Sequence, residues 1–317
     1  MGSAIEVINL TKQYTNVLAV DRINFGVEGG EIFGFLGPNG AGKTTTIRIL
    51  TGLTKPSGGE AKIFGHDISR EAITAKSYMG IVPEESNVYH DLSAWDNMMF
   101  TGELYHTSRA ERERRGKELL DMFGLYDRRD EKVRGFSKGM KRRLTISMAL
   151  INSPRLLFLD EPTAGLDVQS TLIIKGVIRE QNKRGVTVFL TTHNIEEANV
   201  TCDRVAIINR GRIAVMDRPE NLKKTIQSVQ SVEVAFDKTQ LVVMRDLEGI
   251  PSVNEVRKEG DKYRLYTEDP PTVLAGTWDY ARAYGLRMIS VNTLGPSLED
   301  VFVRLTGITA MPKEGGA

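Results

Sequence analysis

Apolar and polar residues alternate through residues 5–36, with Gly and Glu residues at the intervening turns. A period of two is typical of strands that bury one face. The stretch ends in EIFGFLG (31–37), which is almost entirely apolar, as in a strand buried on both faces. A Gly-rich loop follows, and residues 43–53 then space Ile47 and Leu50 as on an amphipathic helix. The pattern therefore predicts a strand, a loop and a helix in direct succession.

Residues 91–150 have a mostly helical pattern. Ser108 followed by Glu111 predicts a capping box at a helix start. An apolar stripe at helical spacing comes after it, formed by Leu119, Leu120, Phe123 and Leu125. This region is therefore expected to be a helical insertion in the domain that surrounds it.

Two short apolar runs follow, RLLFL (155–159) and GVTVFLTTH (185–193), and both suit buried parallel strands. Residues 169–183 between them have a helical pattern. Residues 205–217 predict a hairpin with its turn at residues 209–211. Strands that alternate with helices indicate an α/β domain with a largely parallel sheet.

The pattern changes near residue 225. SVEVAFD alternates, residues 253–269 predict a hairpin with a Gly-Asp turn, and residues 272–286 are helical in pattern. A last helix is predicted in residues 296–307, with Pro at its start, acidic residues in its first turn and Gly at its end. These elements indicate a second, small α+β domain.

The predicted organisation has three parts. The fold class is α/β for the first domain, with a small α+β domain after it. The boundaries are residues 1–225 for the first domain, about 85–153 for its helical subdomain, 226–308 for the accessory domain and 309–317 for a disordered tail.

Composition narrows the function. The net charge of +1 in 317 residues gives no global electrostatic case for binding nucleic acid or an anionic membrane surface. The single cysteine, Cys202, excludes an intrachain disulfide and a cysteine cluster for zinc, and we expect it to be buried and inert. No stretch approaches the roughly 18 apolar residues of a membrane helix, and the N-terminus does not resemble a signal peptide. We therefore expect no membrane crossing.

The Gly-rich loop GPNGAGKTT matches the phosphate-binding pattern G-x-x-x-x-G-K-[ST], and it lies between a predicted strand and helix as that motif requires. Its glycines let backbone N–H groups surround phosphate oxygens at a helix N-terminus. Lys43 can reach the β- and γ-phosphates, and the Thr44 hydroxyl can hold Mg²⁺. The residues expected to contact nucleotide are Gly37, Pro38, Asn39, Gly40, Ala41, Gly42, Lys43, Thr44 and Thr45.

Three polar residues follow the two later buried strands. Asp160 and Glu161 come directly after the first, and His193 ends the second. Ligands of open α/β sheets bind at this edge, so Asp160 could hold Mg²⁺ and Glu161 could orient or deprotonate an attacking water. His193 would lie within reach of a γ-phosphate. The alternative, a solvated acidic pair and a structural histidine, is less favoured behind a phosphate loop.

Taken together, these motifs resemble the ATP-binding cassette (ABC) ATPases over about residues 4–222. The resemblance implies a P-loop NTPase fold with a β-rich subdomain and a helical insertion. It places Tyr14 where the family has an aromatic that stacks on adenine, and Asp167 of TAGLD in the D-loop. RGFSKGMKRRL (134–144) aligns with the family signature, usually LSGGQ, so Ser137 and Gly139 are implied to contact the ATP of a second ATPase subunit.

The C-terminal segment GPSLEDVFVRLTG, after a small extra domain, looks like the multidrug, daunorubicin-resistance and sodium-export (ABC-2) type of exporter subunit. This resemblance implies an ATPase that powers a separately encoded integral membrane permease. It also implies a head-to-tail homodimer or closely related heterodimer on the cytoplasmic face of the cell membrane. Residues from Glu84 to about Phe100 would contact the permease, and ATP and Mg²⁺ would be the cofactors.

Two positions depart from the family pattern. Glu84, in GIVPEES, replaces the usual Gln, whose neutral carbonyl contacts Mg²⁺ and the attacking water. A Glu can also hold a hard cation, so we expect Glu84 to keep a metal and catalytic role with altered Mg²⁺ dependence. Lys138 replaces the first Gly of the signature pair, where it could crowd the second subunit's phosphate or help to bind it. The alternative is a purely structural role, in which Ser137 only caps a basic helix.

Two other functions compete with the transporter subunit. An ABC ATPase acting on nucleic acid or ribosomes usually has two cassettes or long coiled coils, whereas this chain has one phosphate loop and no heptad run. A nucleotide-dependent regulatory module with weak hydrolysis would explain Glu84 and Lys138. The presence of Lys43, Asp160, Glu161 and His193 argues against it.

Overall fold

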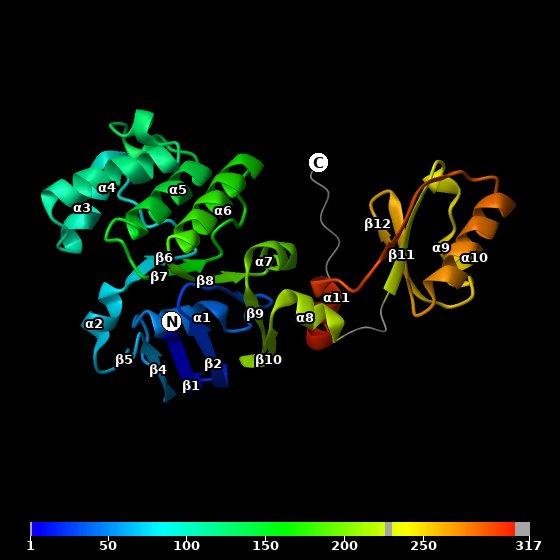
Figure 1. Cartoon of the computed structure of the whole chain (residues 1–317), viewed down its shortest axis with the longest axis horizontal. Coiled ribbons are helices and arrows are strands. Elements are labelled where there is room, and N and C mark those ends of the chain that lie inside the picture. Colours follow the sequence, from blue (N-terminus) through cyan, green and yellow to red (C-terminus); the bar gives the residue numbers. More distant parts are fainter. Residues whose placement is uncertain (1, 226–229, 308–317) are drawn as a thin grey trace. The chain divides into compact units, whose positions relative to one another are not determined.

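The structure is a computed structural model that describes residues 2–225 and 230–307, so the predicted tail at 309–317 lies outside the described residues. The chain divides into two compact units, Met1–Pro219 and Glu220–Ala317, which are described separately (Figure 1). Across the described ranges, no helix combines the length and apolar character that a bilayer span requires.

The central sheet of the first unit has six strands. In spatial order they are β10 (Arg212–Asp217), β9 (Arg204–Asn209), β3 (Ile32–Leu36), β8 (Thr187–Thr192), β7 (Leu156–Asp160) and β6 (Met79–Val82). All neighbours are parallel except β10, which pairs antiparallel with β9 through the predicted hairpin. Every residue of β3, β7 and β8 is buried, as near-continuous apolar runs predict for a parallel sheet covered on both faces.

The register of the central strands determines where their carboxyl ends meet. Leu36 of β3 pairs with Thr192 of β8, and Asp160 of β7 pairs with Thr191 of β8. The loop that leads from β3 into α1 (Lys43–Leu50) therefore begins beside the residues that follow β7 and β8. Segments that lie far apart in the sequence emerge at the same edge of the sheet, where open α/β sheets bind ligands.

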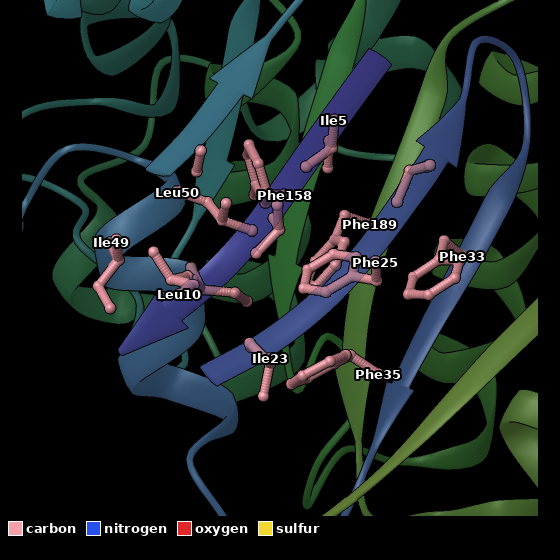
Figure 2. Packing of buried hydrophobic residues seen from close by; sticks show 14 of the residues in the cluster. Ile5, Leu10, Ile23, Phe25, Phe33, Phe35, Ile49, Leu50, Phe158 and Phe189 are labelled. Atoms are coloured by element: carbon pink, nitrogen blue, oxygen red, sulfur yellow. The ribbon is translucent and has the colours of Figure 1, made fainter. Parts of the chain in front are cut away.

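A second, antiparallel sheet packs against the central sheet. Its strands are β2 (Leu18–Glu28), β1 (Ser3–Gln13), β4 (Gly58–Ile63) and β5 (His66–Asp67) in spatial order. Figure 2 shows aromatic rings from both sheets packed together in the main core. The Phe25 ring of β2 stacks on those of Phe33 and Phe189, at centroid distances of 5.8 and 6.1 Å. Burial of each such side chain stabilises the fold by about 1.5–3 kcal/mol, so the phosphate-loop strand is firmly held.

The remaining helices of the first unit are α2 (Ala72–Ser77), α3 (Ala94–Leu104), α4 (Arg109–Met122), α5 (Lys138–Ala149), α6 (Val168–Lys183) and α7 (Ile195–Thr201). Single 3₁₀ turns lie at Tyr126–Arg128 and Val133–Gly135. In Figure 1, α3, α4 and α5 lie together, apart from the antiparallel strands β1, β2 and β4. The helical character predicted for residues 91–150 is confirmed.

The capping box predicted at Ser108 is only half formed. The Ser108 hydroxyl accepts a hydrogen bond from the Glu111 N–H at 3.4 Å. The Glu111 carboxylate does not return to the Ser108 backbone, because it pairs with the Arg114 guanidinium at 2.7 Å. A charged partner one turn along the helix is a stronger competitor for a carboxylate than a backbone N–H. The second half of that prediction is therefore wrong.

The second unit has one antiparallel sheet, with β12 (Val253–Glu259), β13 (Lys262–Thr267), β11 (Gln230–Phe236) and β14 (Met288–Leu294) in spatial order. Its helices are α9 (Met244–Glu248), α10 (Pro270–Ala283) and α11 (Leu298–Thr306), with a 3₁₀ turn at Thr239–Leu241, and α8 (Pro219–Lys224) begins at the last residue of the first unit. A complete capping box begins α11, because Ser297 and Asp300 satisfy each other's backbone N–H groups. The unit has its own hydrophobic core, as an independent domain requires.

Candidate functional site

The phosphate loop leaves β3 and turns sharply into α1. Gly42 has φ of 110°, and a Cβ there would lie 2.5 Å from the Ala19 carbonyl oxygen, so only glycine fits. The Lys43 side chain folds back across the loop, and its Nζ donates hydrogen bonds to the carbonyl oxygens of Gly37 at 2.7 Å and Pro38 at 3.3 Å. The loop is therefore closed around the lysine ammonium.

Asp160 and Glu161 point in different directions although they are neighbours in sequence. Asp160 is buried at the end of β7, where its Oδ1 accepts a hydrogen bond of 2.5 Å from the Thr191 hydroxyl. Glu161 has φ of 49°, in the left-handed region that non-glycine residues rarely adopt. This backbone conformation sends its side chain away from Asp160 and towards the phosphate loop. Two adjacent carboxylates are thereby available for two different tasks.

Glu161 lies between a lysine and a histidine. Its Oε2 is 2.9 Å from His193 Nδ1, and its Oε1 is 3.4 Å from Lys43 Nζ. The Glu161 side chain is 8% exposed and that of His193 is 57% exposed. An ionised carboxylate only accepts hydrogen bonds, so His193 must donate from Nδ1, which leaves Nε2 on the open side of the ring. The structure thus brings three predicted residues into direct contact.

These residues line a cavity of about 380 Å³. Its lining consists of Ala19, Pro38, Asn39, Gly40, Gly42, Lys43, Thr44, Thr45, Glu84, Glu161 and His193. The volume lies within the usual range of small-molecule sites, which is about 300–1,000 Å³. The cavity therefore gathers most of the predicted nucleotide contacts in one place, and Glu84 with them. Asp160 is not among its lining residues.

Mg²⁺ and ATP fit the groups that are present. The Oε1 atom of Glu161 is buried and forms an ion pair with Lys43, but it accepts no hydrogen bond from the described residues, so it can accept one from a further polar group. Thr44 and Glu84 line the cavity, and Asp160 adds a second carboxylate next to Glu161. Within the described residues, no set of three or more His, Cys, Asp or Glu could hold a metal alone. Mg²⁺ is usually held by one or two carboxylates together with substrate phosphates, so this donor set suits it.

The signature residues lie at a helix start outside this cavity. Ser137 caps α5, and its hydroxyl accepts a hydrogen bond from the Met140 N–H at 3.2 Å. Asp167 caps α6 by accepting from the Ser170 N–H at 2.7 Å and hydroxyl at 2.9 Å, and these bonds lower the pKa of Asp167. A Cβ on Gly139 would collide with the Ser170 hydroxyl and lie 2.9 Å from Asp167 Oδ2. Gly139 and Asp167 therefore meet within one chain, away from the phosphate loop.

Lys138 and Tyr14 also lie outside the phosphate-loop cavity. Lys138 Nζ is 2.6 Å from the point that a Cβ on Gly165 would occupy, so the ammonium covers the loop before α6. Lys138 also lines a second cavity, of about 440 Å³, together with Glu84 and Glu161. The Tyr14 ring is 41% exposed after β1, with Lys12 Nζ 5.0 Å from its centroid. Its predicted contact with adenine stays a prediction.

Known proteins place the chain in a family. Residues 20–164 match the family described as "ABC transporter". The linearmycin resistance ATP-binding protein LnrL of Bacillus subtilis (strain 168) is 35% identical over 310 residues, covering 96% of this chain and 99% of the relative. The daunorubicin/doxorubicin resistance ATP-binding protein DrrA of Streptomyces peucetius is 36% identical over 307 residues, covering 96% and 92%. The chain belongs to the ABC transporter family.

Two further likenesses sharpen this membership. The Nod factor export ATP-binding protein I of Cupriavidus metallidurans is 36% identical over 307 residues, covering 97% of this chain and 98% of the relative. The solved structure of the ATP-binding cassette MJ0796, a dimer in a post-hydrolysis state with ADP and Pi, has a TM-score of 0.62 at 27% identity and covers 68% of this chain and 98% of its own. The chain is an ABC ATPase subunit with exporter-type relatives, and the predicted resemblance and fold class are confirmed.

Two buried charged residues at this site, Glu197 and Arg142, were not predicted from the sequence. Glu197 of α7 accepts hydrogen bonds from the hydroxyls of Thr163 at 2.7 Å and Thr192 at 3.0 Å, which joins the ends of β7 and β8. Arg142 of α5 donates to backbone carbonyls at the site. In sequence, Arg142 is one of three consecutive basic residues in a helix, a pattern that normally indicates a solvated face. Only its spacing relative to the apolar positions of α5 could have indicated burial.

The close approach of α5 and α6 yields a prediction for Gly139→Ala. Replacing a helical glycine by alanine normally stabilises a helix by about 1 kcal/mol. Here the added methyl group meets Ser170 and Asp167, so we expect the free energy of unfolding to fall by about 1–3 kcal/mol. Denaturant unfolding of the full chain without nucleotide measures this change. Gly135→Ala is the matched control, because a Cβ at Gly135 meets nothing within 4 Å, and equal effects of both variants would contradict the prediction.

Proposed function

We propose that this chain hydrolyses ATP to power a separately encoded integral membrane permease, as one half of a head-to-tail pair of ATPase subunits in an exporter. The pair would be a homodimer or a closely related heterodimer, held at the cytoplasmic face of the membrane by the permease. The observation that carries the proposal is the convergence of Lys43, Glu161 and His193 in one cavity at the sheet edge. The exporter direction rests on the names of the relatives.

The first half of the proposed site binds ATP and activates the attacking water. Lys43 and the loop N–H groups hold the β- and γ-phosphates, and releasing Lys43 from the Gly37 and Pro38 carbonyls frees its donors for them. Thr44, Asp160 and Glu84 would hold Mg²⁺, which screens phosphate charge when bound. Attack on the γ-phosphate also requires a residue that orients and deprotonates water, and that role falls to Glu161.

Glu161 has the surroundings of a general base. It accepts the proton of the attacking water, and the hydrogen bond from His193 Nδ1 keeps its carboxylate in place. The Nε2 edge of His193 would face the γ-phosphate, and it donates a hydrogen bond to a phosphate oxygen when both ring nitrogens carry a proton. The lysine and the histidine thus hold one carboxylate from two sides.

The second half of the site would come from the other subunit. Ser137 and Gly139, at the start of α5, would contact the second subunit's ATP, and Asp167 would contribute beside them. Their position supports this division, because none of the three lines the phosphate-loop cavity of its own chain. Tyr14 would stack on adenine. The N-terminus of α5 supplies partial positive charge for phosphate.

The permease contact is proposed for residues from Glu84 to about Phe100. Tyr89 and Phe100 are both exposed, and their rings make an edge contact at a centroid distance of 5.0 Å. An exposed aromatic pair is typical of protein interfaces. Glu84, at the start of the same segment, lines the phosphate-loop cavity. Movement of the permease surface would therefore reach the proposed magnesium site.

Glu161→Gln tests the proposed chemistry. We expect Mg²⁺-dependent turnover to fall by about 10²–10⁴-fold, because glutamine cannot accept the proton. ATP binding, measured by equilibrium titration, should be retained because the phosphate loop is unchanged. Glu196→Gln, at an exposed neighbour of the site, is the control. Undiminished turnover of Glu161→Gln would remove Glu161 as the base, and absent wild-type turnover even with the permease would favour a regulatory module.

Glu84→Gln tests the departure from the family pattern. A unit charge about 4 Å from another changes binding by roughly 1–4 kcal/mol in water-like to partly buried surroundings. The neutral variant should therefore need more Mg²⁺ for half-maximal turnover and bind nucleotide more tightly when Mg²⁺ is absent. Magnesium titrations of both variant and wild type measure this, with Glu85→Gln as the control. The hypothesis fails if turnover and Mg²⁺ requirement are both unchanged.

A further inference from the structure

Arg142 is a buried arginine whose donors are all used on backbone carbonyls. Its side chain is on α5 and is 3% exposed. The Nε atom donates to the Pro162 carbonyl at 3.0 Å. Nη2 donates to the carbonyls of Asp160 at 2.5 Å and Glu161 at 2.9 Å. Nη1 donates to those of Glu84, at 3.1 Å, and Pro83. A guanidinium has five N–H donors, and each has its own acceptor here.

These bonds join three separate segments of the chain. Pro83 and Glu84 follow β6, residues 160–162 end and follow β7, and Arg142 belongs to the helix that Ser137 caps. The guanidinium is planar and rigid, so it fixes the relative positions of the carbonyls it contacts. A displacement of α5 is therefore transmitted to both carboxylate-bearing segments of the proposed site.

The bonds also account for the unusual backbone at Glu161. Three successive carbonyls, of residues 160, 161 and 162, turn towards one guanidinium. The left-handed φ of 49° at Glu161 makes this turn possible, and that conformation is strained for a residue with a side chain. The hydrogen bonds from Arg142 offset the strain. Without them, Glu161 is free to relax and to lose its contacts with His193 and Lys43.

The side-chain carboxylates remain available for chemistry. Arg142 donates to the carbonyl oxygens of Asp160, Glu161 and Glu84, and none of its hydrogen bonds goes to their carboxylate groups. Burial lowers the pKa of Arg142 to about 10, which is still well above neutral pH, so the side chain is charged. Its positive charge thus lies near the carboxylates of Asp160, Glu84 and Glu161 and pairs directly with none of them.

We propose that Arg142 is a positioning residue for ATP hydrolysis. It holds the backbone of Glu161 and Glu84 in the conformation that catalysis requires, and it links both residues to the signature helix α5. The proposal rests on the function proposed above for Glu161. It assigns to Arg142 no contact with nucleotide. Lysine cannot take this role, because an ammonium has three donors at a single point and cannot reach five separated carbonyls.

The test compares Arg142→Lys and Arg142→Met with the wild-type full chain. Because misplacing a reacting group by about 1 Å can lower a rate roughly 100-fold, we expect a loss of that size in kcat. Equilibrium binding of a fluorescent ADP analogue should change far less, since the phosphate loop does not contact Arg142. The Mg²⁺ concentration for half-maximal turnover should rise, because Glu84 is displaced as well. Arg142→Lys decides the test if Arg142→Met does not fold, because it keeps the charge and the aliphatic stem.

Arg115→Lys is the matched control. Arg115 is also a buried arginine, 8% exposed, that donates to a backbone carbonyl, that of Leu150 at 3.0 Å, but it lies away from the nucleotide cavity. The Arg115→Lys variant should lower the unfolding temperature as Arg142→Lys does, and it should leave kcat unchanged. The proposal is overturned if Arg142→Lys keeps wild-type kcat and Mg²⁺ dependence, or if both arginine variants lose turnover in step with stability. Turnover retained in Glu161→Gln would instead overturn the proposed function.

Discussion

The hydrogen-bonded register of β3, β8 and β7 is the constraint on which the rest of the site depends. It places the ends of three strands side by side, with Leu36 opposite Thr192 and Asp160 opposite Thr191. A slip of one residue would turn these buried side chains to the opposite face of the sheet. The aromatic core beneath the sheet holds the register, because the rings of Phe33 and Phe189 stack at 5.7 Å. Packing therefore determines the distances on which the chemistry relies.

A second constraint is the backbone conformation of Glu161, directly after β7. The left-handed backbone at Glu161 separates its carboxylate from that of Asp160, and the fully bonded guanidinium of Arg142 supports that conformation. Strain at a functional residue persists where surrounding contacts over-determine it. Because Arg142 belongs to α5, the same contact links the proposed base to the helix that Ser137 caps. Association of two subunits at Ser137 would thus act on Glu161 through a rigid connection.

The sequence predicted the parts of the site that depend on local pattern. The phosphate loop is contiguous, and Asp160, Glu161 and His193 each follow an apolar strand, so their meeting at one sheet edge could be inferred. Features that depend on packing between distant segments were not accessible. The burial of Arg142 requires carbonyls about twenty and sixty residues away in sequence, and Gly139 owes its role to Ser170 on another helix.

In the proposed dimer, each ATP is held between two chains. The measurement that tests this arrangement mixes two variants of the full chain, Lys43→Ala and Ser137→Ala, each expected to be inactive alone, and follows Mg²⁺-dependent ATP hydrolysis. The first retains Ser137 and the second retains the phosphate loop, so a mixed pair has one complete site. We expect turnover of the mixture to rise well above the sum of the separate variants. Turnover equal to that sum, or a Ser137→Ala chain that is fully active alone, would contradict it.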